Sequence, residues 1–331
     1  MEADSSEQLP QLTGEQRLVR RVAALLFSAF YAWIPWYTWR PRSFKDITAY
    51  ANQLDALRAR SEELDFERLT SAEYIFSEPL WRQVLAFAGE FADKPSDALA
   101  IISFVAMALF TSYLFVRASP WLVAFFMFNP AVIDLVIAQT RSALAAAIVL
   151  TAITSKRKLL ASALILAASL IHSLTFVLVF SFCVAKLLES QQHKFSHATL
   201  SGWALCIGML LAVVLALGYA GVLEAVDDRR AYVEHTAGNT ISYTAYWVLL
   251  AAALAMTPRM QNIVRWNDFY AIMMMSIPLI MTFFTVPAAR LVPLCFPLII
   301  ESISARPKPV RTYLAMSLAA YQLLHYTYWL N

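Results

Sequence analysis

The chain has 331 residues, of which 60% are hydrophobic and 15% are charged, and its mean hydropathy is +0.56. These values exclude a soluble globular protein, because several apolar stretches approach or exceed the roughly 20 residues that a helix needs to cross a bilayer. The net charge is only +3 and its basic residues are scattered among loops, which excludes a nucleic-acid-binding protein.

The first apolar run covers residues 22–39 and follows a polar amino terminus. Residues 1–16 are polar and expected to be disordered, and Arg17, Arg20 and Arg21 come directly before the run. Because short basic segments stay in the cytoplasm, we expect a cytoplasmic tail of residues 1–21 and then a single transmembrane domain, residues 22–331. The run is long and lacks a small-residue cleavage site, which favours an anchor over a signal peptide.

Residues 40–97 form the long polar insert of the chain and are expected outside the cytoplasm. Residues 45–60 can form an amphipathic helix, and residues 78–91 place Leu80, Trp81 and Leu85 on one face. Amphipathic helices beside a membrane usually lie in the interface with the apolar face among the lipids. We therefore predict two interfacial helices in this first outer loop.

The remaining apolar runs alternate with basic loops. With residues 22–39 they make about eleven predicted transmembrane helices, and each interior loop carries Lys or Arg. The further runs are residues 98–116, 120–139, 142–154, 159–171, 172–186, 200–223, 241–256, 269–286, 291–300 and 313–330. The periodicity is helical, without the alternating segments of a membrane barrel, so the predicted fold is an all-α polytopic membrane protein.

Residues 139–174 form a hydrophobic hairpin with Arg141 near one end, His172 near the other and a basic tip at residues 155–158. If the tip is cytoplasmic, Arg141 and His172 lie close together at the opposite side of the membrane. The arms here have only 13–15 residues, so this end would form the floor of an outward-facing cavity. Charged or titratable groups are costly at such positions, which indicates a function.

Other charged and aromatic residues are expected on the same outer side. Besides Arg141 and His172, the candidates are Arg40, Arg42, Asp46, Glu78, Arg229, Arg230, Tyr232 and Arg290. The planar guanidinium of arginine binds phosphate or diphosphate oxygens through two parallel hydrogen bonds. Asp46 and Glu78 are acids that could take a proton from a hydroxyl. Singly, such arginines often only anchor to lipid phosphate, and a lone histidine on an apolar helix usually only packs.

Motifs for metals and common cofactors are absent from the sequence. The five histidines show no HxxxH spacing, and there is no DxD, P-loop or GxGxxG sequence. We therefore expect neither a metal nor a cofactor.

The order of these residues resembles the EpsG family, which is related to the Wzy-type polymerases of O-antigen and exopolysaccharide. The resemblance rests on Arg40, Arg42, Asp46 and Tyr50, on Glu78 and Asn129, and on QTRSALA at Arg141, LIHSL at His172 and AARL at Arg290. It covers residues 20–305. Lys45 stands where the family usually has glycine, and Ser142 where it usually has glutamine.

The resemblance implies a GT-C-like, metal-independent glycosyltransferase in the bacterial inner membrane, with its active site facing outward. Donor and acceptor would be glycans on undecaprenyl diphosphate, and other polysaccharide-assembly proteins are implied partners alongside membrane lipids. Arg141 and Arg290, with Arg229 or Arg230, would hold the leaving diphosphate. Asp46, Glu78 or His172 would be the base, with Asp46 ranked first because GT-C enzymes use an acid in the loop after the first span. Tyr232 and Trp81 could stack on sugar rings.

Other functions remain open at the level of sequence. Within the same class, the chain could transfer a single sugar from a lipid monophosphate or act as an O-antigen ligase. In another class it could transport lipid-linked glycans, although no inverted repeat is visible. A membrane scaffold is a third alternative, for which the arginine and histidine of the hairpin would be unnecessary.

Overall fold

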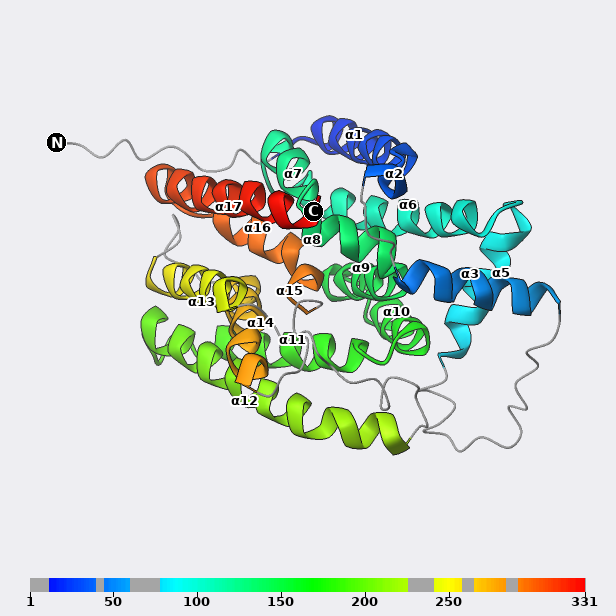
Figure 1. Cartoon of the computed structure of the whole chain (residues 1–331). Helices are drawn as coiled ribbons and strands as arrows, with labels where there is room; N and C mark the ends of the chain where they lie inside the picture. Colours follow the sequence, from blue (N-terminus) through cyan, green and yellow to red (C-terminus); the bar gives the residue numbers. More distant parts are fainter. Residues whose placement is uncertain are drawn as a thin grey trace.

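The computed structural model describes residues 12–39, 45–59, 78–225, 241–257, 265–283 and 291–330. Every regular element in these ranges is a helix, as the sequence predicts. The helices form an elongated bundle in which α3 and α5 extend from one end (Figure 1).

The first part of the bundle is built around α6, Pro95–Leu114, and α9, Thr140–Thr154. Helix α1, Gly14–Trp33, packs on α6, and α10, Lys158–Ile171, packs on α9. Thr13 caps α1 in a reciprocal hydrogen-bonded capping box with Gln16. This cap starts the helix inside the predicted tail, so residues 14–21 are helical and the expectation of disorder up to residue 16 is wrong for its last three residues.

The second part surrounds α14, Trp266–Phe283, whose side chains are buried along most of its length. Around it lie α11, Thr175–Ser190, α12, His197–Ala225, α13, Ile241–Met256, and α16, Phe296–Ser304. Contacts of α9 with α11 and of α6 with α16 join the two parts.

Gly208 allows α12 and α14 to approach closely. A Cβ atom at Gly208 would overlap Ser276 Oγ and the Met273 carbonyl oxygen, whereas one at Gly202 on the same helix would have no neighbour within 4 Å. We expect Gly208→Ala to destabilise the protein by about 1–3 kcal/mol, because backbone must move to relieve the overlap. Gly202→Ala should be neutral or slightly stabilising. Thermal unfolding of both variants in detergent checks this, and equal melting temperatures would contradict it.

Three predicted straight runs are interrupted. Residues 22–39 form α1 and a separate short α2, Trp36–Trp39. Residues 120–139 form α7, Pro120–Met127, then α8, Pro130–Ile133, and the π-helix η2, Asp134–Ala138, with a 71° bend after α7. Residues 291–300 divide into α15, Leu291–Leu294, and the start of α16. Proline follows each of the last two breaks, at Pro130 and Pro297, and disfavours a continuous helix there.

Two described helices, Pro95–Leu114 and His197–Gly218, are long and apolar enough to cross a membrane, and the bent pair of Pro120–Met127 with Pro130–Ala138 would make a third. Helices α9, α10 and α13 are apolar but shorter. Large apolar side chains also lie on the surface, including Trp33, Trp121 and Leu159, each at least 85% exposed. Such a surface is typical of a protein in contact with lipid.

The amphipathic helices of the first loop are present as α3, Lys45–Arg58, and α5, Pro79–Glu90. Their predicted placement, with the apolar faces among lipids, is wrong for both helices. In α3, Tyr50 and Leu54 are buried, and the helix contacts α5 and α6. The apolar face of α5 also packs on protein. Trp81, Leu85 and Ala88 are buried, and α5 contacts α3, α6 and α10. Phe87 is exposed and packs edge-to-face on Phe91. The face that was predicted to meet lipid therefore holds α5 against the rest of the bundle.

Candidate functional site

Glu78 lies immediately before α5 in a left-handed backbone conformation, with φ 56° and ψ 55°. Among the described residues it is the one non-glycine residue with positive φ, and this region costs an L-residue about 1–2 kcal/mol. Its side chain makes no capping hydrogen bond with α5. The carboxylate is instead directed at α9 and α10. Strain of this kind in a buried charged residue favours a functional role.

Arg141 is the second residue of α9. A positive charge in the first turn is disfavoured by the helix dipole, so this position requires a nearby anion. Glu78 supplies one, because Arg141 Nη1 donates a hydrogen bond to Glu78 Oε2 and forms an ion pair with it. The π-helix η2 ends just before α9, and π-helical turns are frequent at functional sites.

His172 ends α10 and reaches the same carboxylate. Its Nδ1 atom lies 2.6 Å from Glu78 Oε1. Glu78 thus joins both ends of the hairpin, and the predicted closeness of Arg141 and His172 is confirmed. Glu78 is 5% exposed, His172 is 8% exposed and the Arg141 side chain is 22% exposed. A carboxylate this deeply buried is tolerated because it is paired and hydrogen-bonded.

Aromatic side chains of α3 and α5 support Arg141 from behind. The guanidinium carbon lies 5.9 Å from the centre of the Tyr50 ring, a cation–π arrangement. Trp81 packs edge-to-face on Tyr50 at 5.0 Å between ring centres, and its indole N–H donates to Gln53 Oε1 at 3.1 Å. Trp81 is 1% exposed, so the predicted stacking of sugars on this ring is wrong. The ring holds Tyr50, and thereby the guanidinium, in place.

Two polar atoms beside this cluster are buried without a hydrogen-bond partner. They are Arg141 Nε and Gln139 Oε1, and Gln139 directly precedes α9. An unsatisfied buried polar atom costs about 1–3 kcal/mol. Arg141 Nη1 donates its hydrogen bond to Glu78. The Nε–H on the other side of the planar guanidinium can therefore donate to an acceptor such as a phosphate oxygen. Gln139 Oε1 can accept a hydrogen bond from a hydroxyl.

Comparison of the chain with protein-family models, curated proteins and solved structures gave no match. In the described part of the chain, no three His, Cys, Asp or Glu side chains are grouped as metal ligands would be.

Asp46, the base ranked first from the sequence, belongs to α3, the helix that carries Tyr50. It lies in the first turn of α3, four residues before Tyr50, and this spacing puts the two side chains on one face of the helix. The other predicted binding residues lie outside the described residues. These are Arg40, Arg42, Arg229, Arg230, Tyr232 and Arg290.

Sequence reasoning missed a fully buried ion pair between Arg306 and Asp268. Arg306 Nη1 donates to Asp268 Oδ2 at 3.1 Å and Nη2 donates to the Leu254 carbonyl at 2.9 Å, and both ionic side chains are 0% exposed. In the predicted topology, Arg306 falls in the interior loop between the runs of residues 291–300 and 313–330. The pair connects α13 and α14 with the end of α16, so its role is structural. The sequence feature that could have predicted this pair is Asp268, an acidic residue in the first turn of the mostly apolar α14.

A second buried carboxylate, Glu301, was also missed. It accepts a hydrogen bond from the Tyr113 hydroxyl and lies 3.7 Å from Arg117 Nε. The Arg117 guanidinium also lies over the Tyr113 ring at 4.1 Å. This arrangement repeats the carboxylate, arginine and tyrosine of the Glu78 cluster, without a histidine. It connects the carboxyl-terminal end of α6 to α16 and offers a matched control for experiments on Arg141.

Proposed function

We propose that the chain is a membrane glycosyltransferase that joins glycan units carried on a lipid diphosphate and releases the lipid diphosphate, with Glu78, Arg141 and His172 at its reacting centre. One observation carries the proposal: a single buried carboxylate binds an arginine and a histidine where two apolar helices meet. The resemblance to the EpsG family supplies the reaction class. An eleven-span, GT-C-like arrangement in a bacterial inner membrane, with this centre facing outward, belongs to the same proposal.

His172 is the proposed general base. Its Nδ1 is within hydrogen-bond distance of Glu78, and with the proton on Nδ1 the Nε2 atom is the nitrogen that can accept one. The acceptor hydroxyl gives its proton to Nε2 while its oxygen bonds to the anomeric carbon of the donor sugar. Glu78 holds the ring orientation and stabilises the imidazolium that forms, as the carboxylate of a catalytic triad does. Glu78 is then a positioning residue.

Arg141 is the proposed ligand of the leaving diphosphate. The bond between the anomeric carbon and the phosphate oxygen breaks, and negative charge accumulates on that oxygen. The unpartnered Nε of Arg141 lies in the first turn of α9, where the helix dipole also favours an anion. Tyr50 restricts the guanidinium beforehand, so little reorganisation is needed during the reaction.

Asp46 is the competing base. Its place on the Tyr50 face of α3 keeps it a candidate to deprotonate the acceptor. Comparison of Asp46→Asn with His172→Gln decides between them, since the variant that loses the base has the lower rate of transfer at saturating acceptor.

Reaction of the purified full chain in proteoliposomes tests the function. The substrate is a lipid-diphosphate-linked oligosaccharide repeat unit, and the products are resolved by glycan length. We expect a ladder of longer lipid-linked glycans and one released lipid diphosphate for each bond formed. Movement of the substrate across the bilayer without lengthening would indicate a transporter and overturn the proposal.

The reaction is expected to continue in EDTA. Arg141 can neutralise the leaving diphosphate electrostatically, as a divalent cation does in other enzymes. The initial rate of lipid diphosphate release should change by less than about twofold when EDTA is added before substrate. Loss of activity that magnesium or manganese restores would contradict this expectation.

A further inference from the structure

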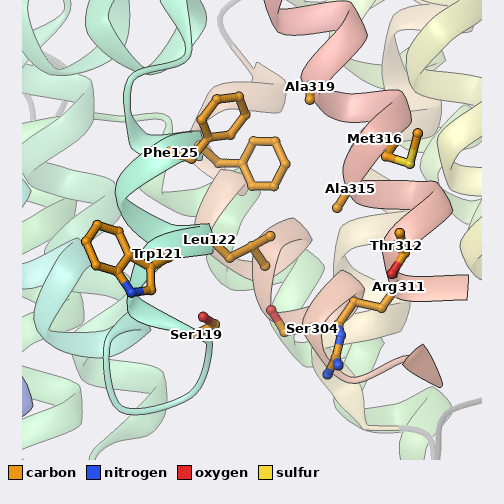
Figure 2. A pocket seen from close by; sticks show the side chains of 11 residues that line it. Ser119, Trp121, Leu122, Phe125, Ser304, Arg311, Thr312, Ala315, Met316 and Ala319 are labelled. Carbon is orange, nitrogen blue, oxygen red and sulfur yellow. The ribbon is translucent and has the colours of Figure 1, made fainter. Parts of the chain in front are cut away.

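Helices α7 and α17, Lys308–Trp329, face each other across a pocket (Figure 2) and are joined by hydrogen bonds at one end. Gln322 Nε2 donates to the Phe125 carbonyl at 3.2 Å, and Tyr326 donates to the Phe128 carbonyl. The amino-terminal half of α17 makes no hydrogen bond to α7 within the described ranges. The two helices are therefore joined towards the carboxyl end of α17 and are not joined by hydrogen bonds towards its amino end.

A cavity of about 580 Å³ occupies the open end of this pair. Its walls are apolar side chains, among them Leu122 and Phe125 of α7 and Ala315 and Ala319 of α17 (Figure 2). The space is a groove open to the surface, and its lining residues Trp121, Phe125 and Met316 are exposed. A space of this size between two apolar helices therefore fits an alkyl chain.

The mouth of the cavity is polar and positively charged. Ser119, Ser304 and Arg311 lie at the end of the groove opposite Phe125 and Ala319 (Figure 2). The Arg311 guanidinium has no hydrogen bond or ion pair to any described residue, whereas Arg117 nearby is paired with Glu301. A guanidinium binds phosphate oxygens through parallel N–H donors. An apolar groove that ends at an unpaired arginine matches an amphiphile with a phosphate head group.

We propose that this groove binds an anionic phospholipid, with one acyl chain between α7 and α17 and its phosphate on Arg311. The groove is a separate site from the Glu78 cluster, because the two lie at different levels of the bundle. Ser103 of α6 donates to the Val136 carbonyl of η2 at 2.8 Å, which places η2, the element directly before α9 and Arg141, at the level of Ser103. The mouth lies beyond Leu114, which is about 17 Å further along α6. The proposal is independent of the reaction at Glu78.

Native mass spectrometry of the full chain, released from detergent, tests the proposal. The protein is titrated with phosphatidylglycerol and with phosphatidylcholine of the same acyl chains. We expect one bound phosphatidylglycerol per chain and about a tenfold preference over phosphatidylcholine, because the choline ammonium neutralises the head group and is repelled by the Arg311 guanidinium. Arg311→Gln should abolish the preference, whereas Lys308→Gln, an exposed charge one turn earlier, should change it by less than twofold.

A second pair of variants tests the acyl-chain groove. Ala319→Trp should fill it and prevent binding, whereas Ala320→Trp, exposed and outside the groove, should bind normally. The proposal fails if both phospholipids bind equally to the wild type, if Arg311→Gln keeps the preference, or if Ala319→Trp still binds. It also fails if inorganic phosphate displaces phosphatidylglycerol, or if a dimer forms in place of a lipid adduct. If Ala319→Trp does not fold, the Arg311→Gln comparison still decides.

Discussion

Replacing His172 by glutamine is expected to lower the rate of glycan transfer by about 100-fold to 10 000-fold, the usual contribution of a positioned general base. Glutamine can still donate a hydrogen bond to Glu78, so the carboxylate keeps a partner and the protein should reach the membrane at its normal level. Glutamine has no nitrogen that can accept the proton of the attacking hydroxyl. The measurement is the release of lipid diphosphate in proteoliposomes, with protein quantified in the same vesicles.

His197→Gln is the matched control. His197 begins α12, and its Nε2 lies 3.3 Å from Ser201 Oγ, so it is also a histidine at a helix end with a polar side-chain neighbour. Its replacement should leave the rate within about twofold. Normal activity of His172→Gln at normal protein level would show that His172 only packs against Glu78. The role of base would then pass to Asp46.

Arg141→Lys is expected to lower the rate by about 100-fold to 1000-fold, the effect of removing one preorganised donor from a charged transition state. Lysine keeps the charge and can still pair with Glu78. It lacks the planar fork, so it cannot bind Glu78 at one edge and present a second fixed edge to a diphosphate. Protein level should be normal, and most repeat units should remain unpolymerised. The measurement is the length distribution of the lipid-linked glycan.

Arg117→Lys is the control, because Arg117 also pairs with a buried carboxylate and lies over a tyrosine ring. Arg117→Lys should leave the length distribution of the lipid-linked glycan nearly unchanged. If Arg141→Lys and Arg141→Ala both gave normal chain lengths at normal expression, Arg141 would be only a structural or lipid-anchoring residue. The assignment of the reacting centre to this hairpin would then be withdrawn.

The two substitutions should not be additive. Glu78 binds both Arg141 and His172, so a change at either residue alters the carboxylate that orients the other. The double variant should therefore lose less activity than the product of the two single losses, as is usual for residues that act as a unit.

The sequence alone determined the helical class and the membrane-like composition, because both follow from the amount and spacing of apolar residues along the chain. The sequence also predicted that Arg141 and His172 lie close together. They lie at the two ends of a short hairpin whose basic tip occupies the turn, and antiparallel neighbours joined by a short turn place their far ends side by side. These are local properties, and periodicity reports them directly.

Tertiary structure decided which group joins the two ends. Glu78 is 63 residues from Arg141 and 94 residues from His172 in the chain. The rotation of α5 that buries Trp81 and aims Glu78 at both depends on packing against α3, α6 and α10. In the same way, Arg306 looks like a charge in a loop when only the sequence is known. In the folded protein it is the fully buried partner of Asp268. Hydrophobic periodicity identifies a helix and its apolar face, but which protein surface covers that face depends on contacts between segments distant in the chain.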